Sequence, residues 1–127
     1  IIPKLTKWLE KNGQDALNTG VAYSADPYKR RIVLSGEEAW QIVNQGKNYP
    51  IQSAGANMLK LTMVSLPKQF PIVLVIHDEV VLEVPKGKAK EAVKALKVVM
   101  EKSADYITGI KGIIKVVPRI ANNLTKE

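Results

Sequence analysis

Apolar residues follow two kinds of spacing along this chain. Helical spacing predicts helices over residues 3–12, 36–45, 51–66 and 88–104. Short runs rich in β-branched residues predict strands over residues 20–24, 31–34 and 113–117. The densest apolar run, residues 72–84, is interrupted only by His77, Asp78 and Glu79. We expect a hairpin of two buried strands with these three polar residues at its apex.

Local signals suggest where some of these elements begin and end. Gly13 is expected to end the first helix. Ser35 and Glu38 have the spacing of a capping box, which predicts a helix that begins at Gly36. Pro50 has no amide hydrogen to donate to the carbonyl of Gly46, so a helix that continues through it must kink or restart.

Together these elements predict an α+β fold in which helices back an antiparallel sheet that contains the hairpin. The helix over residues 88–104 is expected to cover the sheet, and residues 113–117 to form its third strand. At 127 residues the chain fits a single domain with a real core. Four segments follow in order: residues 1–47 (helix, basic hairpin and helix), residues 48–66 (a long helix), residues 71–85 (the apolar hairpin) and residues 87–118 (helix and strand).

Composition narrows the functional classes. Nineteen basic residues against twelve acidic ones give a net charge of +7, which suits a polyanionic partner such as nucleic acid, although a generally lysine-rich surface is about as good an explanation. The chain has no cysteine and one histidine, so a zinc site is disfavoured and carboxylate-bound magnesium or manganese remains open. No apolar run approaches the roughly 20 residues that span a bilayer, so we expect no membrane partner. The start lacks both a signal-peptide pattern and a methionine, which favours an intracellular chain that is processed or part of a longer one.

The polar apex of the apolar hairpin is the main candidate for chemistry. Burying an unpaired charge is costly, so adjacent carboxylates at Asp78 and Glu79 require a cation, either a basic side chain or a divalent metal. A plain solvated turn is the alternative, because hairpin turns are usually polar and Asp is a favoured turn residue. Against that alternative, the turn contains neither Gly nor Asn, which tight two-residue hairpins prefer.

Two further polar clusters are candidates for binding nucleic acid. Asn48 and Gln52 are four residues apart and share a helix face, where amides could read the acceptors of the minor groove. Two solvated amides explain them better when they are taken alone. Lys29, Arg30 and Arg31 follow an aromatic residue and could neutralise phosphates, or could form a solvated basic turn.

Taken together, the three clusters resemble one family. The segment Ile76-His77-Asp78-Glu79-Val80-Val81-Leu82-Glu83-Val84-Pro85 resembles motif C of family A DNA polymerases, the DNA polymerase I family. The segment Asn48-Tyr49-Pro50-Ile51-Gln52 is similar to the helix that precedes motif C, and Tyr28-Lys29-Arg30-Arg31 is similar to a basic segment further upstream. The order and rough separations agree, and the resemblance covers nearly the whole chain.

The resemblance implies a role for each cluster. Asp78 would be one of two aspartates that hold the catalytic Mg²⁺ ions (or Mn²⁺), with Glu79 a nearby carboxylate. His77 would lie by the primer terminus, and Gln52 and Asn48 would touch the minor-groove side of new base pairs. Lys29, Arg30 and Arg31 would approach the DNA backbone. The implied partners are primer-template DNA and deoxynucleoside triphosphates.

The chain also departs from the family pattern. The family usually has Gly-Thr-Ala-Ala-Asp after the glutamine, where this chain has Ser53-Ala54-Gly55-Ala56-Asn57, so Asn57 removes a charge. Motif A, with the second metal-binding aspartate, and the fingers helix that binds the triphosphate are absent from the sequence. We therefore expect the C-terminal part of a polymerase palm that needs a complementary larger fragment for activity. A non-catalytic nucleic-acid-binding remnant of a polymerase is the alternative.

Overall fold

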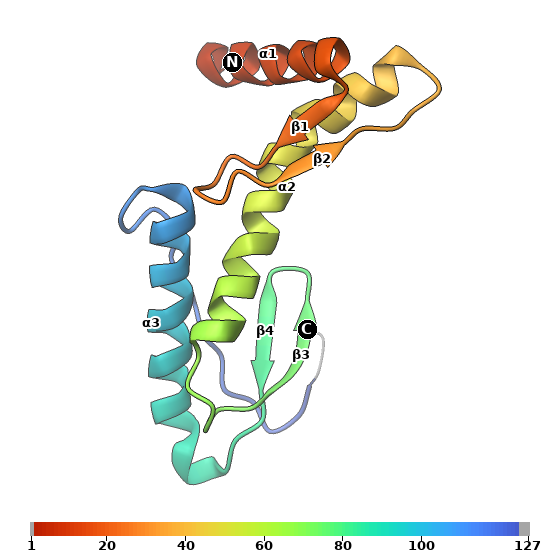
Figure 1. Cartoon of the computed structure of the whole chain (residues 1–127). Helices are drawn as coiled ribbons and strands as arrows, with labels where there is room; N and C mark the ends of the chain where they lie inside the picture. Colours follow the sequence, from red (N-terminus) through yellow and green to blue (C-terminus); the bar gives the residue numbers. More distant parts are fainter. Residues whose placement is uncertain (1, 125–127) are drawn as a thin grey trace. The chain divides into compact units, whose positions relative to one another are not determined.

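The computed structural model describes residues 2–124, which form three α-helices, one short 3₁₀ helix and two separate two-stranded antiparallel sheets (Figure 1). The α+β class is therefore confirmed. The chain divides into two compact units after Asn57, within the longest helix. We call them the N-terminal unit and the C-terminal unit.

The N-terminal unit contains α1 (Pro3–Thr19), β1 (Val21–Tyr23), β2 (Arg31–Val33) and the first part of α2 (Ala39–Ser65). Strands β1 and β2 pair antiparallel, with Val21 opposite Val33 and Tyr23 opposite Arg31. A small apolar cluster holds the unit together. Its buried members are Ala16, Ala22 and Leu34, and Ile32, Ile42 and Tyr49 pack against them.

Helix α1 is longer than the sequence predicted, because Gly13 lies inside it and not at its end. Proline at the first helical position suits the start of the helix, where an amide hydrogen has no partner in any case. Gly20 ends α1 in the left-handed conformation (φ 69°) and donates its amide to the carbonyl of Ala16. Gly13 has a packing role instead, since a Cβ there would lie 2.9 Å from Cγ1 of Val43 in α2.

Helix α2 starts later than predicted and is not interrupted by proline. The predicted capping box does not form. The Oε1 atom of Gln41 accepts hydrogen bonds from the amides of Glu37 and Glu38 at 2.9 and 3.3 Å, and the helix begins at Ala39. Pro50 lies within the helix, which continues through it to Ser65.

The C-terminal unit contains the last turns of α2, strands β3 (Ile72–Ile76) and β4 (Glu79–Leu82), a 3₁₀ turn (Lys86–Lys88) and α3 (Ala89–Thr108). Its core lies where α3 meets the end of α2 and the open end of the β3–β4 hairpin. The buried residues there are Leu66, Phe70 and Ala92, with Ile72, Leu82, Val84, Ala95, Leu96 and Val99 packed against them.

The predicted third strand over residues 113–117 does not form. Backbone amides of the segment that follows α3 donate hydrogen bonds to carboxylates of α3 and do not pair with a strand. The amide of Val116 donates to Glu101 Oε1 at 3.0 Å, and that of Gly112 donates to Asp105 Oδ1 at 2.7 Å. Within residues 2–124 no helix has both the length and the apolarity to cross a membrane.

Candidate active site and nucleic-acid interface

The carboxylates at the hairpin apex are held by a regular two-residue connection. Strands β3 and β4 pair up to Ile76 opposite Glu79, which leaves His77 and Asp78 as the turn. The sequence had placed Glu79 in the apex loop together with His77 and Asp78. In the structure it is the first residue of β4. The side chains of His77, Asp78 and Glu79 are all exposed.

His77 adopts a positive φ of 53°, which is uncommon for a residue other than glycine. Tight hairpin turns usually place Gly, Asn or Asp at such positions, because a Cβ is unfavourable there. The turn thus keeps a histidine where glycine would be less strained.

The hairpin strands are less buried than the apolar sequence predicted. Val80 is buried, but Val73, Leu74 and Ile76 are exposed by 52%, 38% and 38%. The pairing is also irregular between Ile72 and Leu74. The two strands form a sheet on their own, so the described part of the chain covers only part of their surface.

The donor set at the apex suits a hard cation but is incomplete. Asp78 and Glu79 offer carboxylate oxygens, which Mg²⁺ prefers. Residues 2–124 contain no group of three or more His, Asp or Glu side chains that could hold a metal.

Asn48 and Gln52 lie in the N-terminal unit on α2, and both are exposed. The helix remains regular enough across Pro50 for the two amides to share one face, as their spacing predicts. The hydroxyl of Ser53 donates to the carbonyls of Tyr49 and Pro50 at 2.6 and 3.2 Å.

The close packing of α1 against α2 fixes the part of α2 that carries these amides. A Cβ at Gly46 would collide with Ala16 Cβ and lie 2.9 Å from the carbonyl oxygen of Asn12. Only glycine allows the two helices to approach so closely. Asn48 lies two residues after Gly46 on the same helix, so this contact between the helices holds the part of α2 that carries the amide.

Lys29, Arg30 and Arg31 lie at the end of the β1–β2 connection and are exposed. Lys29 has a positive φ of 49°. Backbone bonds close this connection, since the amide of Ser24 donates to the carbonyl of Arg30 at 2.8 Å and the amide of Lys29 to that of Asp26 at 3.2 Å. The three cations are thus presented by an ordered turn.

Sequence reasoning missed two residues that organise this turn, Asp26 and Asn57. Asp26 is only 1% exposed and Asn57 only 3%. Asn57 Nδ2 donates to Asp26 Oδ2 at 2.6 Å, and Asn57 Oδ1 accepts from Arg30 Nη1 at 3.0 Å. One signal was present in the sequence. Asn57 is a polar residue among small and apolar ones, and it lies four residues after Ser53, on the buried face of α2.

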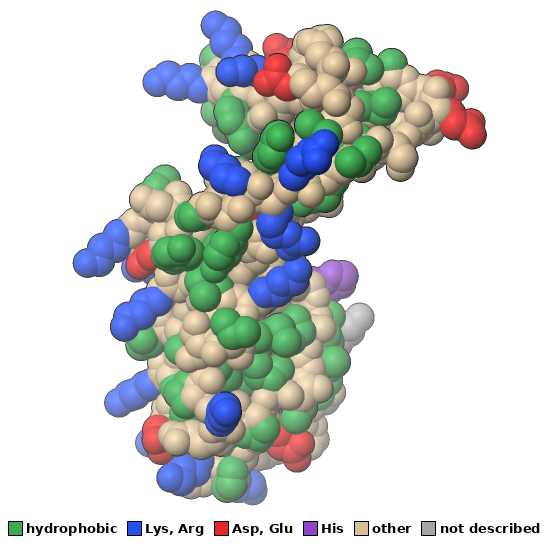
Figure 2. Space-filling view, in the orientation of Figure 1, with side chains coloured by type: hydrophobic (Ala, Val, Ile, Leu, Met, Phe, Trp, Pro, Cys, Tyr) green, Lys and Arg blue, Asp and Glu red, His purple; other side chains and the backbone are tan. Residues whose placement is uncertain are grey.

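Basic side chains are distributed over both units (Figure 2). Exposed basic residues lie along α3 as well as on the β1–β2 connection. Two lysines at α3 form ion pairs, Lys88 with Glu91 at 3.7 Å and Lys97 with Glu101 at 3.9 Å. Exposed pairs of this kind contribute little to stability. The excess charge favours polyanions in general, and hydrogen bonds order the connection that carries Lys29, Arg30 and Arg31.

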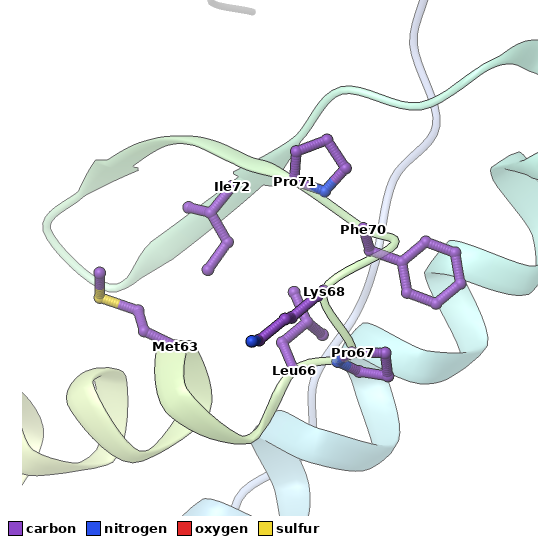
Figure 3. A pocket seen from close by; sticks show the side chains of 7 residues that line it. All are labelled: Met63, Leu66, Pro67, Lys68, Phe70, Pro71 and Ile72. Atoms are coloured by element: carbon purple, nitrogen blue, oxygen red, sulfur yellow. The ribbon is translucent and has the colours of Figure 1, made fainter.

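A pocket of about 220 Å³ lies in the C-terminal unit, and none of the predicted site residues lines it (Figure 3). It is lined by Met63, Leu66, Pro67, Lys68, Phe70, Pro71 and Ile72. Figure 3 shows these side chains around the connection between α2 and β3. The lining is apolar apart from Lys68 and offers no pair of acid and base.

Comparison with known proteins agrees with the sequence motifs. The family model described as DNA polymerase family A matches residues 2–124. A thermostable DNA polymerase I of Thermus filiformis is 33% identical over 110 residues, which cover 78% of this chain and 13% of that protein. A DNA polymerase I of Aquifex aeolicus (strain VF5) is 40% identical over 91 residues, or 66% of this chain and 15% of its own length.

A DNA polymerase I of Streptococcus pneumoniae serotype 4 (strain ATCC BAA-334 / TIGR4) is 41% identical over 63 residues, 44% of this chain and 7% of that protein. The matched part of the chain thus spans between 7% and 15% of the length of these relatives. No solved structure matches.

Proposed function

Since this chain belongs to DNA polymerase family A, we propose that it forms the C-terminal part of a catalytic palm in template-directed DNA synthesis. The observation that carries the proposal is the family match over residues 2–124, which includes a His-Asp-Glu sequence at the apex of a paired hairpin. The chain spans 13% of the length of its Thermus filiformis relative, so the complete activity requires residues outside it.

Asp78 would hold the catalytic metal with Glu79 beside it, and His77 would lie against the primer terminus. Mg²⁺ bound there would neutralise the charge that develops on the reacting phosphate. The strand pairing next to the apex limits how far the Asp78 carboxylate can move, which a preorganised site requires. A second carboxylate cluster from another segment would complete the metal site.

The N-terminal unit would hold the duplex. Gln52 and Asn48 are exposed amides on one helix face and would contact the minor-groove side of the newly formed base pairs. Lys29, Arg30 and Arg31 would bind backbone phosphates. Contacts of this kind depend little on the base sequence of the DNA, as template-directed synthesis requires.

Primer extension tests the catalytic part of the proposal. The chain alone should extend a primed template little or not at all, because one carboxylate cluster cannot hold two metal ions. A complementary polypeptide that contains motif A and the fingers should restore magnesium-dependent extension, and Asp78→Ala should abolish it. Glu83→Ala is the matched control, since Glu83 is an exposed acid on the same hairpin, away from the apex. Normal extension by the Asp78→Ala complex would refute the metal assignment.

DNA affinity separates a polymerase from a non-catalytic binding remnant. In a pure binder, Asp78→Ala removes a repulsive charge next to phosphate and should tighten binding, and no complementary polypeptide should confer extension. In the proposed polymerase the same variant loses extension. Robust extension by the chain alone would contradict the need for a second segment.

A further inference from the structure

The β1–β2 connection contains a carboxylate that is almost completely buried. Asp26 is 1% exposed, and its Oδ1 accepts hydrogen bonds from the Ser24 hydroxyl at 3.1 Å and the Tyr28 amide at 2.9 Å. Its Oδ2 accepts the short bond from Asn57. A carboxylate removed from water is costly unless its oxygens are satisfied, and here both are.

Asn57 joins this carboxylate to the basic turn. Its amide nitrogen donates to Asp26 and its amide oxygen accepts from the Arg30 guanidinium, so one side chain binds both a negative and a positive group. The Arg30 amide in turn donates to the Ser24 hydroxyl at 2.7 Å, and this hydroxyl donates to Asp26. Arg30 is therefore held at its backbone and at its head.

Arg30 nevertheless remains available to a ligand. A guanidinium has five N–H donors, and the bond to Asn57 uses one of them. Arg30 is exposed as a residue, whereas Asp26 and Asn57 lie beneath the turn. The arrangement restricts the motion of an arginine without covering it, which lowers the entropy that the side chain loses when it binds a phosphate.

We propose that Asp26 and Asn57 are positioning residues that hold the Arg30 side chain against helix α2, oriented to bind a phosphate of the DNA backbone. The inference rests on the proposed function, in which Arg30 contacts DNA. The family usually has an aspartate at position 57, whereas in this chain the acidic group of the network is Asp26 of the β1–β2 connection. The same network also closes the β1–β2 connection, so a purely structural role is the competing explanation.

The first test is a double-mutant cycle in DNA affinity. The affinity of the full chain for a primed duplex is measured by fluorescence anisotropy over a range of salt concentrations. Arg30→Gln should make the plot of log affinity against log salt less steep by about 0.9, the value for one phosphate contact. Asn57→Ala should give a similar loss, and the double variant should lose little more, because both changes remove the same contact.

The second test exchanges the two partners. In Asn57→Asp two carboxylates would face each other where a hydrogen bond now lies, and the DNA contact of Arg30 should be lost. In the exchange variant D26N/N57D, Asn at 26 would still accept from Ser24 and Tyr28 and would donate to Asp at 57, which would accept from Arg30. The exchange should therefore restore affinity and salt slope.

The possible outcomes separate the two hypotheses. If Arg30→Gln has no more effect than Lys4→Gln, a matched loss of one exposed cation on α1, then the proposed DNA contact itself is wrong. If Arg30→Gln weakens binding but the Asn57 variants only lower the unfolding midpoint, then the proposed function stands and the positioning role is refuted. Failure of the exchange variant to recover affinity while it remains folded would also refute it.

Discussion

Gly46 gives the most direct test of the packing that supports the nucleic-acid interface. In Gly46→Ala the new methyl group would collide with Ala16 and would lie 2.9 Å from a backbone carbonyl of α1. The carbonyl cannot rotate away, so the helices must separate. Overpacking of this kind costs about 1–3 kcal/mol, and a rigid backbone neighbour favours the upper part of that range. Alanine regains about 1 kcal/mol of helix propensity, so the net loss of stability is about 1–2 kcal/mol.

Gly55 provides a control in the same helix. A Cβ at Gly55 would meet nothing within 4 Å, and the residue is exposed. Gly55→Ala should therefore gain the helix propensity alone and stabilise the chain by about 1 kcal/mol. The same substitution nine residues away is thus expected to have the opposite sign.

Chemical denaturation followed by tryptophan fluorescence measures both effects. Both tryptophans, Trp8 and Trp40, belong to the N-terminal unit, so the signal reports the unit in which α1 and α2 are packed. The double variant with Ala16→Gly and Gly46→Ala should lose less stability than the two single losses added together, because Ala16→Gly removes one of the colliding methyl groups. If Gly46→Ala raises the midpoint as Gly55→Ala does, then α1 and α2 are not in close contact at Gly46.

Two further changes test the C-terminal unit. Phe70→Ala removes a side chain that is 4% exposed in the apolar cluster and should cost about 3–5 kcal/mol, measured by far-UV circular dichroism during denaturation; a loss below 1 kcal/mol would mean that this cluster is not a core. His77→Gly should relieve the positive φ and stabilise the hairpin by about 1 kcal/mol in amide hydrogen exchange, while it lowers extension by the reconstituted polymerase. Unchanged exchange in the hairpin would indicate that the turn is not strained.

Periodicity was enough to predict the helices and hairpins but not where they end. Gly13 had the appearance of a helix terminator, and only the partner helix reveals that its small size serves packing. Ser35 and Glu38 have capping-box spacing, yet Gln41 binds the free amides there instead. Residues 113–117 have strand composition, but α3 carboxylates bind backbone amides of that segment. At Gly13 and in residues 113–117 a contact with another helix overrode the local preference, whereas at the start of α2 one local cap replaced another.

The predicted site residues are all exposed, and the residues that support them were not predicted. Exposure of Asp78, Gln52 and Arg30 agrees with their expected roles, which remain predictions. Asp26 looked like an ordinary Asp-Pro turn, and Asn57 like a lost charge. The hydrogen bond between them joins residues 31 positions apart, and no spacing rule covers that distance. Their contact explains the departure at Asn57, because an aspartate there would face the buried Asp26 carboxylate.

The hairpin that carries Asp78 is attached to its unit at one end. Ile72, Leu82 and Val84, which pack on the apolar cluster, lie at the end remote from the turn. Nearer the turn Val80 is buried, whereas Leu74 and Ile76 are exposed. Two-stranded ribbons have little stability of their own. Local opening should therefore become easier from base to tip, within the limits that the strand pairing sets. A surface that docks against the exposed strands would restrict the apex further and stabilise the metal site that we propose there.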